Sequence, residues 1–328
     1  MSILVENPLS NLKKYYIKKI VIHLLFILFF LFPSMLFAGE GITANSYILV
    51  EKESFDIIAG RNYHMKLAPA STTKVMTTLL AIEKVDTGET IVADKGVARL
   101  PASKMHLVPG REYSAIDLMN GAMIESANDA AYALAKHIGG SEENFARMMN
   151  YRANEFGAFN THFKNASGLY ANGQYTTCYD LALIFKHALT NDTFRELIAK
   201  KYFFFQDSRK SVRYKNHNRF LFCFDPAIGG KTGFTRKSKH CYVGAFEKDG
   251  RSYILALLNS RDLWGDAVLI LGNLYDRLPS DKELRSARAP SASLSSYKPK
   301  KAKKFAAKKK YKKKVVKKGT NKPVKSGI

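Results

Sequence analysis

The pattern of apolar and polar positions predicts strands at both ends of the central part of the chain and helices between them. Apolar runs at 45–50 and 55–58 flank a polar turn and indicate a hairpin, and strand pattern returns at 241–246 and 253–258. Apolar residues spaced three or four apart predict helices over 71–83, 116–124, 130–138, 145–156, 181–189 and 267–274. This order is typical of an α+β fold, with one antiparallel sheet from both ends and a helical lobe inserted between them.

The first 38 residues have the pattern of a targeting segment. Four lysines at 13–19 precede an apolar run over 20–32, which is followed by Pro33 and by Ala38. A positive stretch, an apolar stretch and a small residue before a polar start are typical of a secretory signal. We therefore predict a signal peptide over 1–38 and an exported body. The apolar segment 20–38 is barely long enough to span a bilayer, so an uncleaved anchor is the alternative.

Charge is concentrated at the other end of the chain. Residues 298–328 contain fifteen lysines and no acidic residue, whereas 39–297 carry only +6 of the total of +24. We predict a disordered Lys-rich tail over 286–328. An exported chain rarely meets nucleic acid, which makes that partner unlikely. Adhesion to anionic envelope surfaces is one interpretation of the tail, and a solvated tail without a specific partner is the other.

Several common chemical signatures are missing from the sequence. The histidines form no metal-binding pair of recognisable spacing, no G-x-S-x-G occurs, and the sequence before Lys231 lacks the first glycine of a phosphate-binding loop. The three cysteines, Cys178, Cys223 and Cys241, allow at most one disulfide. Buried, unpaired thiols are the simpler expectation for them.

A Ser-x-x-Lys motif at Ser71 and Lys74 is a candidate nucleophile and base. The same spacing occurs at Ser10 and Ser295, but only Ser71 begins an amphipathic helix inside the body. Residues three apart share a helix face, so Lys74 can reach the Ser71 hydroxyl. A serine hydroxyl needs an adjacent base, and a lysine can serve as one only if burial or a neighbouring cation lowers its pKa.

Two further motifs follow later in the chain. Ser126-x-Asn128 falls at a turn between two predicted helices, and Lys231-Thr232-Gly233 precedes the predicted strand pair at 241–258. Each alone fits an ordinary turn. The order Ser-x-x-Lys, Ser-x-Asn, Lys-Thr-Gly is the signature of penicillin-binding proteins and class A β-lactamases.

From about residue 44 to residue 277 the chain resembles the D-alanyl-D-alanine carboxypeptidases, which are low-molecular-mass penicillin-binding proteins. The resemblance extends beyond the three motifs to the segments 67–74, 123–131, 165–169 and 229–235, and to Thr176, Thr177 and Asp180. It implies a β-lactamase/transpeptidase-like fold and a serine D,D-peptidase domain over 39–285. It also implies peptidoglycan stem peptides as substrates, β-lactams as inhibitors, no metal or organic cofactor, and a place in the periplasm or on the outer face of the membrane.

The resemblance also implies roles for individual residues. Ser71 attacks the carbonyl between the last two D-alanines, Lys74 accepts its proton, and Ser126 relays a proton to the leaving amine. The backbone N–H groups of Ser71 and Phe234 form the oxyanion hole. The substrate-binding positions implied are Asn128, which holds the substrate amide, then Lys231, Thr232 and Thr235 for the terminal carboxylate, with Gly233 and Phe234 between them. Arg261 is a further candidate for the carboxylate, although a surface charge is the simpler interpretation.

Three alternatives differ in their chemistry. A class A β-lactamase would carry a glutamate with a downstream Leu-Asn to activate the deacylating water, and Glu155 is not followed by that sequence. A binding module with a vestigial site would not need the complete set of catalytic residues. The short sequence between Arg277 and the tail resembles the shorter D,D-endopeptidases, so an endopeptidase that cuts peptidoglycan cross-links with the same site is the main alternative.

Overall fold

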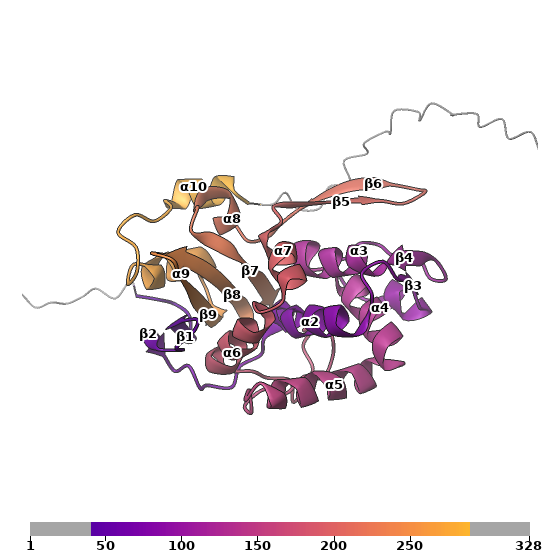
Figure 1. Ribbon diagram of the computed structural model, residues 1–328, viewed down its shortest axis with the longest axis horizontal. Coiled ribbons are helices and arrows are strands. Elements are labelled where there is room, and N and C mark those ends of the chain that lie inside the picture. The colour runs from indigo at the N-terminus through magenta and orange to yellow at the C-terminus, as the bar shows by residue number, and fades with distance from the viewer. Residues whose placement is uncertain (1–40, 289–328) are drawn as a thin grey trace, which may run out of the picture.

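A five-stranded antiparallel sheet forms the centre of the computed structural model, which describes residues 41–288 (Figure 1). Its strands lie in the order β2-β1-β9-β8-β7. Their bounds are β1 Ser46–Glu51, β2 Ile57–Arg61, β7 Ala227–Thr235, β8 Lys239–Lys248 and β9 Arg251–Ser260. Tyr47 of β1 pairs with Leu257 of β9, so the two ends of the body share one sheet. The predicted α+β fold is confirmed.

Helices cover both faces of this sheet. On one face α6 (Cys178–Ala188) packs on β1 and β9, while α9 (Leu263–Leu271) packs on β8 and β9 from the other. The inserted lobe contains α3 (Ala115–Asn120), a π-helical turn (Gly121–Glu125), α4 (Asn128–Gly139) and α5 (Glu142–Glu155). Between the sheet and the lobe runs α2 (Lys74–Lys84), which Figure 1 shows near the centre of the molecule. The active-site motifs lie along this junction.

Two apolar clusters, one on each side of the sheet, hold these layers together. The larger one joins Val75 and Met76 of α2 to the sheet and lobe, and the smaller one packs Phe220 and Ile270 against Phe246. Because β8 and β9 are covered on both faces, their central residues are all buried. Their sequences therefore read as continuous apolar runs rather than as alternating ones.

Several elements were not predicted from the sequence. The segment expected to be a turn before the strand pair is itself the edge strand β7, because pairing with β8 overrides the low strand propensity of its glycines. The other additions are β3 (Thr90–Val92), β4 (Glu112–Ser114), β5 (Tyr202–Gln206), β6 (Ser211–Lys215), α7 (Asp192–Ala199), α8 (Phe220–Cys223), α10 (Asp281–Ser286) and a 3-10 turn at Lys95–Arg99.

Some predicted bounds also differ. The helix expected over 71–83 begins with a 3-10 turn, Ala70–Thr73, and becomes α-helical only at Lys74. The second hairpin strand begins at Ile57 because Phe55 has a positive φ of 62° in the turn. The helix expected over 267–274 begins earlier, at Leu263, and ends at Leu271.

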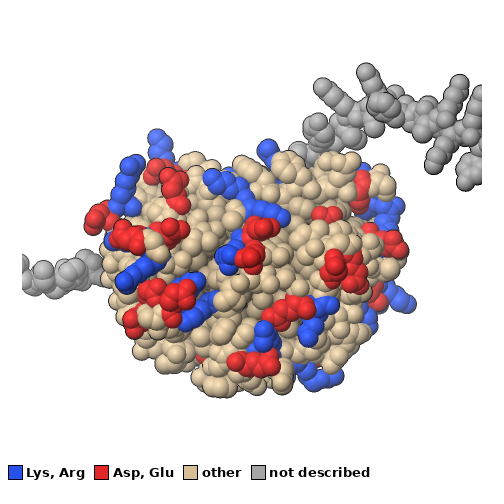
Figure 2. All heavy atoms as spheres, viewed as in Figure 1, with Lys and Arg blue, Asp and Glu red and all other residues tan. Residues whose placement is uncertain are grey.

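The predicted signal peptide over 1–38 and the tail from 289 onward lie outside the described residues. Within 41–288 no helix is long and apolar enough to cross a membrane. All three cysteines are free thiols. On the face shown in Figure 2, basic and acidic side chains of the body are interspersed, as its small net charge leads one to expect.

Candidate active site

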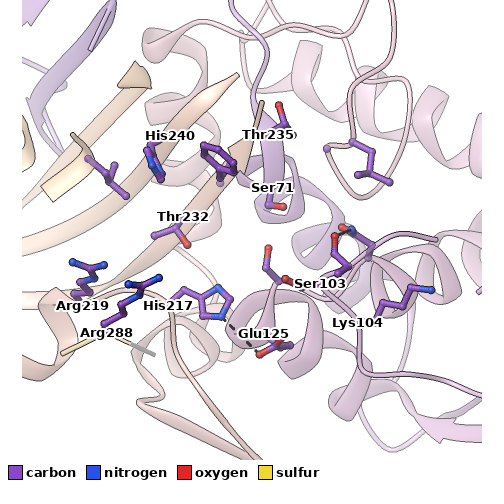
Figure 3. Close-up of a pocket in the computed structure, with 18 of the residues that line it drawn as sticks. Ser71, Ser103, Lys104, Glu125, His217, Arg219, Thr232, Thr235, His240 and Arg288 are labelled. Carbon is purple, nitrogen blue, oxygen red and sulfur yellow. Dashed lines mark hydrogen bonds and ion pairs between the residues drawn. The ribbon is translucent and has the colours of Figure 1, made fainter. Parts of the chain in front are cut away.

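A cavity of about 570 Å³ opens where β7, the start of α2 and the turn before α4 meet. Ser71, Ser126, Asn128 and Thr232–Thr235 line it, so residues of all three sequence motifs share one pocket. Figure 3 shows the Ser71 hydroxyl facing its interior. The fold thus brings together motifs that are separated by more than 50 residues at each step of the sequence.

Close packing of backbone segments fixes the position of Ser71. Ala70, the preceding residue, has a positive φ of 49°. Gly233 of β7 lies so near that a Cβ atom on it would be 2.8 Å from the Ser71 backbone nitrogen. Only glycine lets the edge strand approach the serine this closely. The contact places the backbone of the third motif directly against that of the nucleophile.

Lys74 is fully buried and donates three hydrogen bonds. Its Nζ lies 3.0 Å from the Ser71 Oγ, 2.8 Å from the Asn128 Oδ1 and 2.6 Å from the Ser167 carbonyl oxygen. An ammonium has three donors, so this arrangement satisfies all of them. The predicted contact between Lys74 and Ser71 is present.

The turn before α4 presents the second motif. Ser126 ends the π-helical turn in the left-handed conformation, with φ 62°. Its Oγ accepts a hydrogen bond of 3.0 Å from the Lys231 Nζ, which links the second and third motifs. The Asn128 Nδ2 donates to the carbonyl oxygens of Pro101 and Ala102 at 3.1 and 3.2 Å. Together with its bond from Lys74, these contacts make Asn128 a support of the lysine.

Two buried lysines dominate the electrostatics. Burial lowers the pKa of Lys74 well below its ordinary value, and the like charge of Lys231 lowers it further, against the opposing effect of Asp129. Burial lowers the pKa of Lys231 to about 7, opposed by Glu125. A lysine with a lowered pKa is neutral over a wider pH range and can accept a proton. Lys74 therefore contacts the Ser71 hydroxyl and gives up its proton more readily than an ordinary lysine, as a general base must.

The end of β7 supplies the remaining motif residues. Thr232 and Thr235 are partly exposed in the pocket, and the Thr235 Oγ1 accepts a hydrogen bond of 2.9 Å from the Ser238 N–H. Phe234 is 56% exposed, and its ring centroid lies 4.6 Å from that of His240. The Phe234 side chain therefore forms an aromatic wall at the rim of the pocket, in addition to the role expected of its backbone N–H group.

Besides Lys104, His106 and His240, four charged or titratable residues of the pocket were not identified from the sequence. Glu125, His217, Arg219 and Arg288 all line it, whereas Arg261 does not. The His217 Nε2 lies 3.7 Å from the Glu125 Oε2. Burial raises the pKa of Glu125 to about 7 and lowers that of His217 to about 4. Glu125 could have been suspected because it directly precedes Ser126, whereas the other three belong to segments without a motif.

No cluster of three or more metal-binding side chains occurs among residues 41–288. What the pocket offers instead is a serine hydroxyl beside a buried lysine, with a second serine beside a second lysine. This arrangement belongs to the serine acyl-transferring enzymes that include the penicillin-binding proteins.

Comparison with known proteins specifies the family. The D-alanyl-D-alanine carboxypeptidase family, peptidase S11, matches residues 35–262, and the chain belongs to this family. It is 34% identical over 211 residues to the D-alanyl-D-alanine carboxypeptidase DacF of Bacillus subtilis, a match that covers 62% of this chain and 54% of that protein. It is also 34% identical to DacB2 of Mycobacterium tuberculosis over 66% of this chain and 74% of that one. The chain thus spans about half of the first relative and three quarters of the second.

Solved structures give the same result. A crystal structure of a D-alanyl-D-alanine carboxypeptidase from Mycobacterium tuberculosis matches with a TM-score of 0.68 and 31% identity, and covers 72% of this chain and 92% of that one. The DD-transpeptidase of a Streptomyces strain matches with a TM-score of 0.67 and 27% identity, over 71% and 97% of the two chains. These similarities confirm the β-lactamase/transpeptidase-like fold expected from the sequence.

Proposed function

We propose that the protein is a serine-type D-alanyl-D-alanine carboxypeptidase that removes the terminal D-alanine of peptidoglycan stem peptides and is inhibited by penicillins. The observation that carries this proposal is the contact of 3.0 Å between the Ser71 Oγ and the Nζ of the buried Lys74. A hydroxyl in contact with a base of lowered pKa is an activated nucleophile. Family membership supplies the substrate class.

In the proposed reaction, the Ser71 oxygen attacks the carbonyl carbon of the penultimate D-alanine while Lys74 takes the hydroxyl proton. The bond to the leaving nitrogen breaks as that nitrogen receives a proton through Ser126, which accepts a hydrogen bond from Lys231. D-Alanine leaves, and water then cleaves the acyl ester to release the shortened peptide and regenerate Ser71. Asn128 keeps Lys74 in place through its Oδ1, and its contact with the substrate amide stays a prediction.

The rest of the pocket has roles in the same proposal. The N–H groups of Ser71 and Phe234 stabilise the oxyanion, a kind of contribution worth about 3–4 kcal/mol per donor. The close approach of Gly233 to Ser71 supports this pairing. Lys231, Thr232 and Thr235 receive the terminal carboxylate.

The proposal extends to where the protein acts. Peptidoglycan lies outside the cytoplasmic membrane, and the pattern of residues 1–38 supports export through a signal peptide to the periplasm or the outer membrane face. The fifteen lysines of 298–328 support adhesion to anionic envelope surfaces, an attraction of about 1 kcal/mol per lysine that salt should weaken.

Digestion of isolated muropeptides with purified residues 39–328, followed by chromatography and mass spectrometry, tests the reaction. We expect pentapeptides to lose one alanine while dimers stay intact. Cleavage of dimers with intact pentapeptides would instead assign the protein to the endopeptidases with the same catalytic residues.

Penicillin labelling tests the nucleophile independently. Ser71→Ala should abolish the covalent adduct detected by mass spectrometry. Ser103→Ala is the matched control, because Ser103 lines the same pocket but belongs to none of the three motifs; this variant should still be labelled. Labelling of the Ser71→Ala variant would contradict the assignment.

A further inference from the structure

Two arginines lie together at one end of the catalytic pocket. Arg219 directly precedes α8 and Arg288 follows α10, and both line the cavity. In the view of Figure 3, Thr232 lies between Ser71 and this pair. The pair therefore extends the pocket on the side where the third motif receives the leaving residue in the proposed reaction.

The fold positions the Arg219 side chain and the Arg288 backbone. The Arg219 guanidinium carbon lies 5.3 Å from the centre of the Trp264 ring, close enough for a cation–π contact. The Lys215 Nζ donates a hydrogen bond of 3.2 Å to the Arg288 carbonyl oxygen, and Leu284 anchors α10 in the smaller apolar cluster. Two residues that are 69 positions apart thus reach the same end of the pocket through packing, not through a motif.

Their charge is not balanced within the site. Neither arginine takes part in an ion pair in the described part of the chain, and Glu125, the acidic residue lining the pocket, lies against His217, with 3.7 Å between Oε2 and Nε2. Burial and the like charge of Arg288 both lower the pKa of Arg219, against weaker effects of Asp281 and Asp262. Two adjacent guanidinium groups in a concave site favour an anion that accepts several hydrogen bonds, such as a carboxylate.

We propose that Arg219 and Arg288 bind a second carboxylate, one carried by the leaving part of the substrate. The inference rests on the proposed function, in which Lys231, Thr232 and Thr235 receive the carboxylate next to the leaving nitrogen. A terminal D-alanine has only that one carboxylate and leaves the arginines unoccupied. The substrate class that fills both sites is a peptide whose leaving residue carries a further carboxylate on its side chain.

Three N-acylated peptides test this directly: one ends in D-Ala-D-Ala, one in D-Ala-D-Glu and one in D-Ala-D-Gln. The last two differ only in the second carboxylate. For the wild type, kcat/KM for the D-Glu peptide should exceed that for the D-Gln peptide by about tenfold to a hundredfold, the usual effect of hydrogen bonds to a charged group. In the double variant Arg219→Gln/Arg288→Gln this ratio should fall to about one, mainly through KM, with D-Ala-D-Ala hydrolysis unchanged.

Two further variants separate charge from structure. Arg219→Lys/Arg288→Lys keeps the positive charge and should restore part of the D-Glu preference. Arg285→Gln, on the exposed face of α10, is the matched control and should preserve the wild-type ratio.

Each other outcome overturns the proposal. An equal loss on all three peptides would assign the arginines to the first carboxylate, and a D-Glu preference that survives the double variant would exclude them altogether. A wild type without D-Glu preference, or one that cleaves only D-Ala-D-Ala, would show that no second carboxylate is recognised. A wild type that cleaves no peptide and forms no penicillin adduct would instead refute the proposed function.

Discussion

Gly168 lies so close to Ala70 that a Cβ atom on it would be 1.8 Å from the Ala70 carbonyl oxygen. Gly168 also has a φ of +81°, which side chains disfavour. The carbonyl of its neighbour Ser167 accepts a hydrogen bond from Lys74, and Ala70 precedes the nucleophile Ser71. One glycine therefore sets the distance between the loop that holds the base and the turn that holds the nucleophile.

Gly168→Ala should displace Ser71 and Lys74 relative to each other. We expect the rate of penicillin acylation to fall by about a hundredfold, since displacements near 1 Å cost that much in well-aligned sites. The left-handed backbone alone should cost about 1–3 kcal/mol of stability. The acylation rate and the thermal midpoint measure the two effects.

Gly250→Ala is the matched control. Gly250 has a φ of +72° in the turn between β8 and β9, but a Cβ there meets no atom within 4 Å. It should lose stability without losing the acylation rate per folded molecule. An equal loss of acylation in both variants would show that backbone strain, and not the contact with Ala70, is responsible.

The two buried lysines predict a change in the pH profile. The wild-type acylation rate should rise with pH as Lys74 loses its proton. The like charge of Lys231 is one of the causes of the low pKa of Lys74, so Lys231→Met should raise that pKa. The rising limb of the profile should then move to higher pH, in addition to a lower maximum from the lost contact with Ser126. Stopped-flow acylation across pH 5–10 gives both quantities.

Lys282→Met, on the exposed face of α10, is the control and should leave the limb in place. If Lys231→Met lowers the maximal rate without moving the rising limb, the charge of Lys231 does not affect the pKa of Lys74. Lys231 would then act only through its hydrogen bonds.

Whether a feature of this molecule can be predicted from the sequence depends on how far apart along the chain the residues that determine it lie. The helix that carries Lys74 and the strands β8 and β9 follow from local apolar spacing, and the contact between Ser71 and Lys74 follows from residues three apart. The motif at Lys231 was selected from the sequence, and its Thr232 and Gly233 line the pocket. Its strand was not predicted, because β7 is stabilised by pairing with β8 and not by its own glycine-rich sequence.

The features that the sequence did not predict depend on packing between distant segments. The hairpin of β5 and β6 contains the run Phe203–Phe205, in which buried and exposed positions alternate but all three residues are apolar. The alternation of apolar and polar residues that indicates a strand is therefore missing from the sequence. Arg288 reaches the pocket only because α10 is anchored through Leu284 and because Lys215 holds its carbonyl. No sequence pattern within either segment indicates these contacts.

Glu125 should make stability depend on pH in a definite direction. Its pKa is raised from 4.5 to about 7 by burial and by Asp129, against Lys231. The folded state therefore binds a proton more tightly than the unfolded state. Stability falls as the pH rises from 4.5 to 7, and above pH 7 the whole stabilisation from this proton is lost. His217 and Tyr214 are the other titratable groups that interact with it.

Glu125→Gln removes this ionisation. The thermal midpoint of the variant relative to the wild type should increase from pH 5 to pH 8 by at least about 2–4 °C, the shift that 1 kcal/mol causes in a protein of this size. Glu196→Gln, exposed on α7, should show a constant difference. A constant difference for Glu125→Gln as well would mean that Glu125 is ionised in the folded protein at pH 5.

The cysteines should differ in reactivity according to their burial. Cys178 and Cys241 are fully buried, and burial raises the pKa of both thiols, to about 12 for Cys241. Cys223 is only half-buried, and its pKa is raised less strongly by burial and by Glu283. Because the thiolate is the reactive form, an aromatic disulfide reagent should titrate one thiol per native chain and three after unfolding in denaturant.

Cys223→Ser identifies the reactive thiol. In this variant the native count should fall to zero and the denatured count to two. A wild-type count of one after unfolding without reductant would reveal a disulfide. That outcome would contradict the structure, in which all three cysteines are free thiols. The Cys178 Sγ accepts a hydrogen bond of 3.0 Å from Ser46 in β1. A fast-reacting native thiol in Cys223→Ser would show that the packing around Cys178 or Cys241 opens in the folded protein.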